Sequence, residues 1–585
     1  MAHEHYSAFI KEAFVAPIRS VLIVDDDYPT FDEMLDREIA KQKGEDEPEN
    51  GKRWRAKPER VKNVIANFRR ADRSLLVDIH DGSNVDAKGD KKVASHLHQS
   101  DLLVLDYELD KTKKGDGSRA IEILRGLISN DHFNLVVVHT IEKLDIVFEE
   151  ILIGLLTPSG DTLTEDEQHQ IEEMIAERED AVPDIDADLR DSIGRAQYIH
   201  SRLFEKTYQR TMGQGFQPYS GFSEIAKAAG WDNGSQKLLL RHLLIQAELP
   251  LIEKLSAVDT GFLRISQGAI KWIKSDSVFI AFSDKQIEDD PISALEEALD
   301  DWNPAPSRLF LAKLRAVMDE HGVVAQTEAL ERHYALAQWY ERLLRANGNE
   351  RRSKIAESVA RQSDQLMTII LPQVEKFAKA LVETEATKSR KSIEDLCNHH
   401  FGVDLSKPQS RKRAEREHNA FVCSTKPFGW HLSTGHIFSL ADEYWVCLSP
   451  ACDLVPGQGD VKNAAFGKRI PFMAVKLYDL GNGDVRDVNS NLFIFLDIDN
   501  NVRAFSFNSQ SKEGTAPTWR LFYAESNGHL TDDFRFKLSV AEKGKRRLLF
   551  ARHEVQIVAQ LRYEYALNLL HKLGSSMTRI GLDFV

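Results

Sequence analysis

The sequence has few cysteines and no long apolar run. Only four of its 585 residues are cysteine, which is too few for a disulfide framework and fits a reducing compartment. No uninterrupted apolar stretch approaches the length of a membrane span. The N-terminal segment MAHEHYSAFIKEAF contains acidic residues and lacks an apolar core, so it does not resemble a signal peptide. We therefore expect a cytoplasmic protein without a membrane partner.

Positive charge is also scarce relative to negative charge. The 76 Lys and Arg residues are outnumbered by 91 Asp and Glu residues, and the formal net charge is −15. Such a chain is not built to coat nucleic acid, so any nucleic-acid contact must come from a local basic patch. The concentrated positive segment from Lys388 to Arg416 alternates with acids such as Glu394 and Glu415. For this segment we favour a solvated linker.

The first part of the chain alternates between strand-like and helix-like patterns. Its continuous apolar runs predict buried strands in SVLIVDDD, SLLVDIHDG, DLLVLDYELD and FNLVVVHT. This alternation is typical of a doubly wound parallel sheet, which belongs to the α/β class. After a mostly helical stretch, SVFIAFSDK returns to the strand pattern, and PISALEEALDDW follows as a helix that begins with proline. The sequence therefore predicts a sheet that is interrupted by a helical insertion and then resumed.

The second half of the chain changes character twice. Helical patterns dominate up to about residue 416, and short strand-like runs dominate beyond His418. The segment IVAQLRYEYALNLLHKLG predicts a final helix that ends at Gly574. The predicted divisions are an N-terminal helix (1–19), the first part of the sheet domain (20–144), a helical insertion (145–275), the last strand and helix of the sheet domain (276–304), a helical bundle with a basic linker (305–418) and a β-rich C-terminal domain (419–585).

Polar residues follow the predicted parallel strands at their carboxyl ends. Asp25 and Asp26 follow the first strand, Asp106 the third, Thr140 the fourth and Lys285 the resumed strand. These strand ends meet at one edge of a parallel sheet, where such folds bind ligands. Carboxylates suit Mg²⁺, and an Asp beside that metal can act as a nucleophile toward phosphorus. A Thr hydroxyl and a Lys ammonium can then donate to the phosphoryl oxygens.

This pattern resembles the receiver domain of bacterial response regulators. VLIVDDD resembles the first strand and acid pair of that family, and DLLVLDYELD resembles the strand that ends in the phosphoacceptor. The resemblance implies a flavodoxin-like sheet and a cytoplasmic signalling protein of the two-component type. It also implies a histidine kinase or related phosphodonor as partner, a homodimer through the helical bundle, and a C-terminal output domain.

The same resemblance assigns roles to single residues. It implies that Asp106 is phosphorylated, which makes the protein a phosphoacceptor rather than a turnover enzyme. It implies a Mg²⁺ site formed by Asp25, Asp26, Asp106 and the backbone carbonyl of Glu108. Thr140 matches the switch hydroxyl of the family and Lys285 its lysine, while Asp116 and Gly117 match an Asp-Gly pair after the acceptor loop.

Several departures from the family pattern leave a second interpretation open. Ile141 follows Thr140 where a small residue is usual, and Gln286 follows Lys285 where the family has proline. The chain between Thr140 and Lys285 is also far longer than a compact crossover needs. The alternative is a non-catalytic scaffold or interaction protein with a degenerate receiver, in bacterial stress or phage defence.

A phosphatase of the haloacid-dehalogenase type is a third interpretation. In that case Asp25, Asp27, Thr140 and Lys285 would form the site. However, Pro29 stands where that family has its threonine, and Asp106 would have no role.

Three further motifs were weighed against core packing. The segment FSEIAKAAGWDNGSQKLLLRHLL is similar to a helix-turn-helix, with Lys237, Arg241 and His242 on its second helix, but its apolar residues also suit a core. The cysteines and histidines at Cys397, His399, His400, Cys447 and Cys452 lack the usual two-residue gap of zinc ligands, so buried thiols are favoured. Cys452 with Asp453 is a further candidate site, for which the sequence names no catalytic partner.

Overall fold

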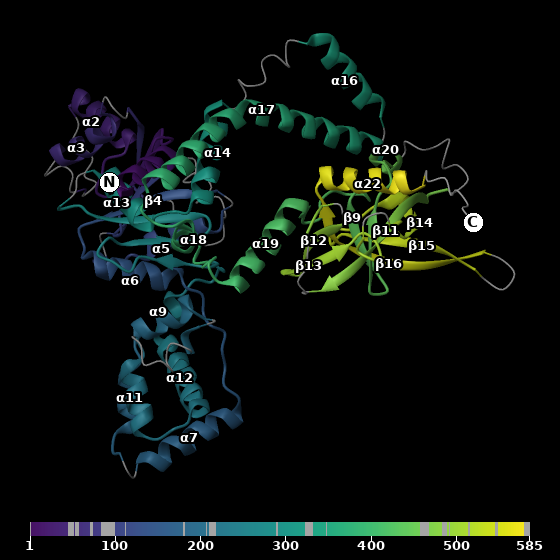
Figure 1. The fold of residues 1–585 in the computed structure, drawn as a ribbon. Coiled ribbons are helices and arrows are strands. Elements are labelled where there is room, and N and C mark those ends of the chain that lie inside the picture. Colours follow the sequence, from purple (N-terminus) through teal and green to yellow (C-terminus); the bar gives the residue numbers. More distant parts are fainter. Residues whose placement is uncertain are drawn as a thin grey trace, which may run out of the picture. The chain divides into compact units, whose positions relative to one another are not determined.

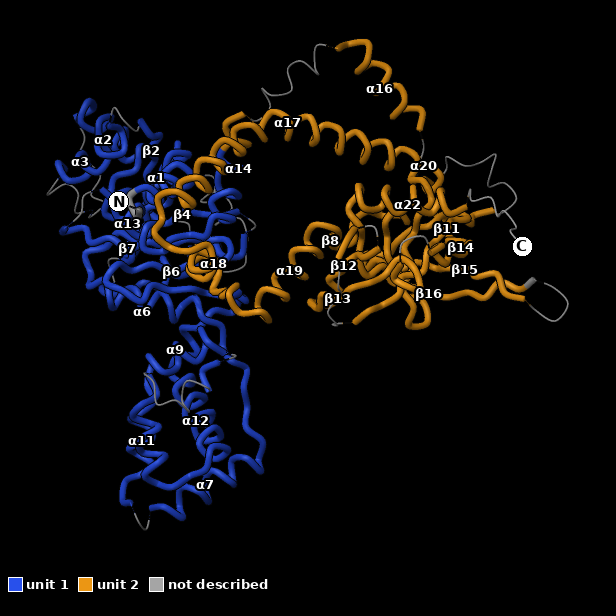
Figure 2. Tube along the Cα trace, in the orientation of Figure 1, with its two compact units in different colours: residues 1–316 blue, residues 317–585 orange. Residues whose placement is uncertain are grey.

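The protein divides into two compact units, Met1–Ala316 and Val317–Val585 (Figure 2), and each is described by itself. The computed structural model describes residues 2–44, 52, 58–70, 74–82, 100–110, 113–130, 132–179, 182–205, 207–209, 218–287, 290–321, 332–346, 348–456, 467–481, 488–490, 492–512, 515–543 and 548–577.

The first unit is built on a seven-stranded sheet with the order β2-β1-β3-β4-β7-β6-β5 (Figure 1). The strands are β1 (Ser20–Val24), β2 (Leu76–His80), β3 (Leu102–Leu105), β4 (Asn134–Thr140), β5 (Arg264–Ile265), β6 (Trp272–Lys274) and β7 (Val278–Asp284). From β2 to β7 the neighbouring strands are parallel. This arrangement confirms the predicted α/β class with a flavodoxin-like receiver sheet.

The sheet is parallel because helices connect its strands. The connecting helices include α2 (Phe31–Lys43), α3 (Pro58–Phe68), α5 (Ser118–Ile128) and α6 (Leu144–Leu155), and α13 (Pro291–Trp302) follows the last strand, β7. Thr30 begins α2 with a capping box, in which its hydroxyl accepts from the Glu33 amide and the Glu33 carboxylate accepts from the Thr30 amide. All seven residues of β4 are buried, which explains why this strand is a continuous apolar run rather than an alternating one.

The N-terminal segment packs on the same unit. It consists of α1 (Ala2–Ile10) and a π-helical turn (Lys11–Val15). The Tyr6 hydroxyl donates to the Pro304 carbonyl at 2.7 Å, and the Phe14 ring lies 5.7 Å from the Trp302 ring. These contacts join the start of the chain to the segment at the end of α13.

The insertion between β4 and β7 is helical over most of its length, as predicted. After α6 it contains α7 (Glu165–Glu179), α8 (Ile185–Asp191), α9 (Arg195–Leu203), α11 (Ser220–Ala228), α12 (Asn233–Glu248) and a 3₁₀ turn (Leu249–Lys254). The last part of the insertion is not helical, because β5 and β6 lie there and add two antiparallel strands beyond β7. Strands of two and three residues are too short for a periodic pattern to reveal them.

The predicted helical section after residue 305 is also present. Its helices are α14 (Pro306–His321), α16 (His333–Arg345), α17 (Gly348–Lys388), α18 (Ile393–Phe401) and α19 (Pro408–Cys423). The boundary between the two units, at Ala316 and Val317, falls within α14. The Trp339 indole N–H donates to the Ser358 hydroxyl at 2.7 Å and joins α16 to α17. Within the described parts of the chain, no helix combines the length and the apolar character that crossing a bilayer requires.

The C-terminal β-rich domain is a nine-stranded sheet. Its strands are β8 (Ser424–Thr425), β9 (His436–Leu440), β10 (Glu443–Cys447), β11 (Ile470–Gly481), β12 (Phe493–Ile498), β13 (Asn501–Ser506), β14 (Trp519–Ala524), β15 (Arg535–Lys543) and β16 (Leu548–Leu561). Because β10 pairs with both β9 and β11, the path β10-β9-β16-β15-β14-β11 closes on itself as a barrel. Phe438, Phe472 and Phe522 pack inside it with ring centroids 5.7–5.9 Å apart.

One boundary in this domain differs from the prediction. The residues Ile557 to Leu561 belong to β16, and the last helix, α22, begins only at Tyr563 and runs to Met577. Val555, Ile557 and Leu561 are buried, and the sheet ladder rather than the local helical pattern decides their conformation. Gly574 consequently lies inside α22 and does not end it.

Candidate functional site

The predicted site residues lie where the ladder of the parallel sheet ends. The Asp25 amide donates to the His80 carbonyl at 3.0 Å, and the Asp106 amide donates to the Val24 carbonyl at 2.9 Å. These bonds continue the pairing of β1 with β2 and of β3 with β1 by one residue. Asp25 and Asp106 are thereby fixed on neighbouring strands at the same edge.

Lys285 reaches this edge from the resumed strand. Its amide donates to the Thr140 carbonyl at 2.8 Å, one residue beyond the register pair Thr140 and Asp284. Its ammonium Nζ lies 2.8 Å from Asp25 Oδ2 and 2.6 Å from Asp106 Oδ2. The exposed fractions are 2% for Asp25, 9% for Asp106 and 8% for Lys285. A buried ammonium thus bridges two buried carboxylates.

Asp26 adds a third carboxylate to this cluster. Asp25, Asp26 and Asp106 each offer an oxygen atom, and the three atoms lie within 4.8 Å of one another. Bringing three carboxylates together, two of them buried, is costly unless cations lie close by. Three carboxylate oxygens at this spacing fit a hard divalent cation such as Mg²⁺. Asp26 is only half-buried, so it is the member of the cluster on the solvent side.

The buried charges shift the acidities of this cluster. Burial raises the pKa of Asp106 to about 7, with the ammonium of Lys285 acting in the opposite direction and the Asp25 carboxylate adding to the rise. For Lys285, burial opposes the charged form, but the carboxylates of Asp25 and Asp106 outweigh it and raise its pKa. Burial therefore disfavours the charged form of the Asp106 carboxylate.

Two residues that the sequence did not single out also enclose the site. Tyr28 is buried, and its ring centroid lies 5.9 Å from Lys285 Nζ. Burial, with the nearby Asp25 carboxylate, raises the pKa of Tyr28 to about 12. The Arg60 guanidinium of α3 donates to the Lys285 carbonyl at 2.5 Å. The position of Tyr28 directly after the Asp run was a weak signal for it, whereas nothing in the sequence indicated Arg60.

The remaining predicted receiver residues lie on the same edge. Thr140 is fully buried, and its hydroxyl accepts from the Glu142 amide at 3.2 Å. The Glu108 side chain accepts from the Gly115 amide. The role predicted for the Glu108 carbonyl and the role of the Thr140 hydroxyl stay predictions.

The loop after Asp106 is held by a close packing contact. The Asp116 carboxylate accepts from the Ser118 amide at 3.0 Å at the start of α5. Gly117 lies against the buried ring of Tyr107, and a β-carbon at this position would overlap with that ring. Gly117 therefore lets α5 begin directly beside the residue that follows Asp106.

The phosphatase interpretation loses its main support in this geometry. It requires the Asp27 carboxylate beside that of Asp25, but the carboxylates that cluster with Asp25 are those of Asp26 and Asp106. The Asp27 amide instead donates to Asp25 Oδ1 at 2.9 Å. Asp27 therefore shapes the turn after β1.

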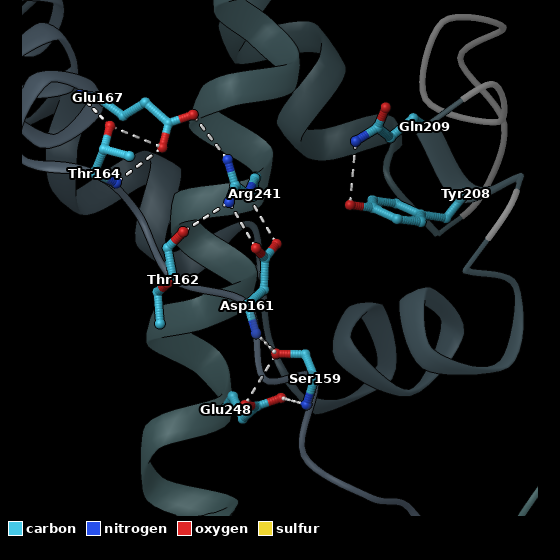
Figure 3. Close-up of polar contacts among 9 residues, drawn as sticks. All are labelled: Ser159, Asp161, Thr162, Thr164, Glu167, Tyr208, Gln209, Arg241 and Glu248. Atoms are coloured by element: carbon cyan, nitrogen blue, oxygen red, sulfur yellow. Dashed lines mark hydrogen bonds and ion pairs between the residues drawn. The ribbon is translucent and has the colours of Figure 1, made fainter.

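The helix-turn-helix candidate is tied into the insertion. Arg241 of α12 donates to Asp161 at 2.8 and 2.6 Å and to Glu167 at 2.9 Å (Figure 3). The buried Glu248 at the other end of α12 accepts from Ser159 and Tyr198. The Arg241 guanidinium is thus committed to the insertion itself, which argues against a base-reading role.

The cysteine motifs do not assemble a metal site in the described part of the chain, where the acidic cluster at Asp25 is the one group found with metal-ligand geometry. Cys423 and Cys447 are buried free thiols, and burial raises the pKa of Cys423 to about 11. Cys452 is exposed, and its sulfur lies 3.7 Å from Asp453 Oδ1. The buried thiols of Cys423 and Cys447 fit the packing interpretation, whereas the prediction of a buried thiol is wrong for the exposed Cys452.

Comparison with known proteins identifies the fold that carries the site. The family model of the response receiver domain matches residues 17–189, which include Asp25, Asp26, Asp106 and Thr140. No curated protein and no solved structure matches the chain. Lys285 lies outside the matched residues and joins the cluster only through the folded sheet. Residues 17–189 of this chain are thus similar to the response receiver domain, and their parallel sheet fits that fold.

Proposed function

We propose that the protein is a response regulator that accepts a phosphoryl group on Asp106 in the presence of Mg²⁺ and relays the change to its C-terminal β-rich domain. One observation carries the proposal, namely that Lys285 pairs with both Asp25 and Asp106 across separate strands. The proposed partners are a histidine kinase or related phosphodonor, and a second copy of this chain bound through the helices of residues 305–418.

The proposed reaction transfers a phosphoryl group from the phosphodonor to the carboxylate of Asp106. An oxygen of the Asp106 carboxylate attacks the phosphorus of the donor, a new P–O bond forms, and the bond from phosphorus to the donor breaks with its electron pair returning to the donor. Asp25, Asp26, Asp106 and the Glu108 carbonyl are the proposed Mg²⁺ ligands. The cation supplies charge neutralisation for the approaching phosphoryl group. Lys285 and the Thr140 hydroxyl would donate to the phosphoryl oxygens.

The added charge is the proposed signal. A phosphoryl group on Asp106 carries about −1.5 to −2 charges; it replaces the charge of the Asp106 carboxylate and lies beside the carboxylates of Asp25 and Asp26. Lys285 would shift from Asp25 toward the phosphoryl oxygens, and the end of β7 would move with it because Lys285 directly follows that strand. This shift would bias the packing of the insertion and the helices that follow.

The test uses beryllofluoride and Mg²⁺ with the full chain. We expect an adduct that is seen by ¹⁹F NMR and a change in the scattering profile, and both should be lost in Asp106→Asn. Asp27→Asn is the matched control, because this carboxylate belongs to the same turn but not to the cluster. An adduct that persists in Asp106→Asn, or no adduct in the unaltered protein, would count against the proposal.

A degenerate receiver that serves as a scaffold is the second candidate. It is favoured by the burial of Asp106 and Lys285, because an ion pair that is already satisfied can hold the sheet edge together without any chemistry. In this case Asp106→Ala and Asp26→Ala would leave function in cells intact, while deletion of residues 421–585 would abolish it. The placement of such a protein in bacterial stress or phage defence belongs to this candidate.

A further inference from the structure

A groove in the C-terminal unit is lined by residues of the helix α19 and of the turn that joins β12 to β13. Its volume is about 1080 Å³. Its lining consists mainly of charged side chains and one aromatic side chain, Phe421. The groove is remote in the chain from Asp106 and uses none of the receiver residues.

The groove gathers positive charge in a chain that is acidic overall. Among its lining residues are the five cations Lys412, Arg413, Arg416, Lys426 and Arg562, against the three carboxylates Glu417, Asp497 and Asp499. Glu417 is neutralised by Arg413 at 2.7 Å on α19. The balance is positive, whereas the whole chain has a formal net charge of −15. Such a local field attracts an anionic ligand.

Two of the cations are held in place by backbone carbonyls. The Arg416 guanidinium donates to Gly481 O at 3.1 Å and to Val502 O at 3.0 Å. The Arg562 guanidinium donates to Phe421 O at 3.0 Å. These bonds fix both side chains before any ligand arrives, which lowers the entropy that binding costs.

An aromatic side chain stands exposed in the same groove. Phe421 is 71% exposed, and the Arg562 guanidinium carbon lies 5.3 Å from its ring centroid. An exposed ring beside an ordered guanidinium group is the kind of surface on which an unpaired base stacks.

We propose that this groove binds single-stranded nucleic acid, with phosphates on Lys412, Lys426 and the two ordered arginines and a base stacked on Phe421. An acidic peptide would use the cations but leaves the exposed ring without a role. A duplex would use the cations as well, but its bases are already stacked. The inference does not depend on phosphorylation of Asp106, so either can fail alone.

The test measures fluorescence anisotropy of a labelled oligo(dT) of about 15 nucleotides with the full chain, over a range of salt. We expect log K to fall with log salt with a slope of about −3, because four cations contact phosphates. Phe421→Ala should weaken binding at least about fivefold. Lys412→Gln with Lys426→Gln should weaken it and make the slope shallower by about 1.4. Asp106→Asn should bind like the unaltered protein.

Matched variants outside the groove are the controls. Phe401 on α18 is also an exposed phenylalanine, and Lys379 on α17 is an exposed lysine, so Phe401→Ala and Lys379→Gln should leave binding unchanged. Undetectable binding at low salt would overturn the inference. An equal loss of oligonucleotide binding in the groove variants and in the control variants would also overturn the inference. It would also be overturned if duplex DNA or polyglutamate bound as tightly as the oligonucleotide and Phe421→Ala had no effect.

Discussion

The ammonium of Lys285 lies 2.8 Å from Asp25 Oδ2, although the two residues are 260 positions apart in the chain. The insertion between them does not displace the fifth parallel strand of the sheet. The chain leaves the sheet after β4 and returns to it as β7 in register with β4. The cluster therefore depends on pairing between strands rather than on proximity in sequence.

Removing the Lys285 ammonium should destabilise the first unit strongly. Lys285→Ala leaves the Asp25 and Asp106 carboxylates buried without their cation, and breaking a buried pair in this way costs about 3–5 kcal/mol. Urea unfolding followed by circular dichroism measures the change. Lys271→Ala is the control, because its pair with Asp145 lies at the surface and should cost at most about 1 kcal/mol. Equal effects of the two variants would contradict the prediction.

Cation binding should strengthen as the pH rises through about 7. The pKa of Asp106 is raised to about 7, so below this pH the folded protein holds a proton that a cation must displace. Since the folded pKa lies above the unfolded value, the stability of the metal-free protein should fall as the pH rises from about 4 to about 7 and level off above that. Isothermal titration with Mg²⁺ between pH 6 and pH 8 checks the first part.

Asp106→Asn is the control for this pH dependence. The variant keeps the shape of the side chain but has no proton to release, so its Mg²⁺ affinity should be weaker and nearly flat over the same range. An unchanged pH dependence in Asp106→Asn would show that another group titrates.

Gly117→Ala should disturb the loop that follows Asp106. The new β-carbon would overlap with the buried Tyr107 ring, and overpacking of this kind costs about 1–3 kcal/mol. Because Tyr107 directly follows Asp106, we expect formation of the beryllofluoride adduct to weaken as well. Gly221→Ala is the control, since nothing lies within 4 Å of a β-carbon at that position of α11. Thermal unfolding should separate the two variants.

Arg241→Ala should loosen the start of the insertion without affecting nucleic-acid binding. The Arg241 guanidinium bonds to Asp161, to Glu167 and to the Thr162 carbonyl. Amide hydrogen exchange in residues 159–167 should become faster in the variant. Lys237→Ala, an exposed position on the same helix, should leave exchange unchanged. Loss of oligonucleotide binding in Arg241→Ala would instead support the helix-turn-helix interpretation.

The strand ends were the most predictable part of this protein. Asp25 and Asp106 directly follow continuous apolar runs, and a parallel sheet leaves little choice about where such ends meet. Tyr28 and Arg60 were not predictable as neighbours of Lys285, because their contacts depend on how α3 and the turn after β1 pack on the sheet. Sequence periodicity carries no information on such packing.

Pairing between strands explains the other differences. The segment around Ile557 suits a helix by its local pattern, but its hydrogen bonds go to β9 and β15. In the same way β6 is a strand because the edge of β7 is available to it, and β5 is a strand because it pairs with β6. Tertiary context decided the conformation at each of these positions.

The hydrogen bonds between β6 and β7 join the returning end of the insertion to the strand that precedes Lys285. Trp272 of β6 pairs with Ala281 of β7, four residues before Lys285. If Lys285 moves on phosphorylation, as proposed, β7 and the strand β6 that is hydrogen-bonded to it would move together. In the proposed signalling step, movement of the last parallel strand, β7, would therefore move the insertion with it.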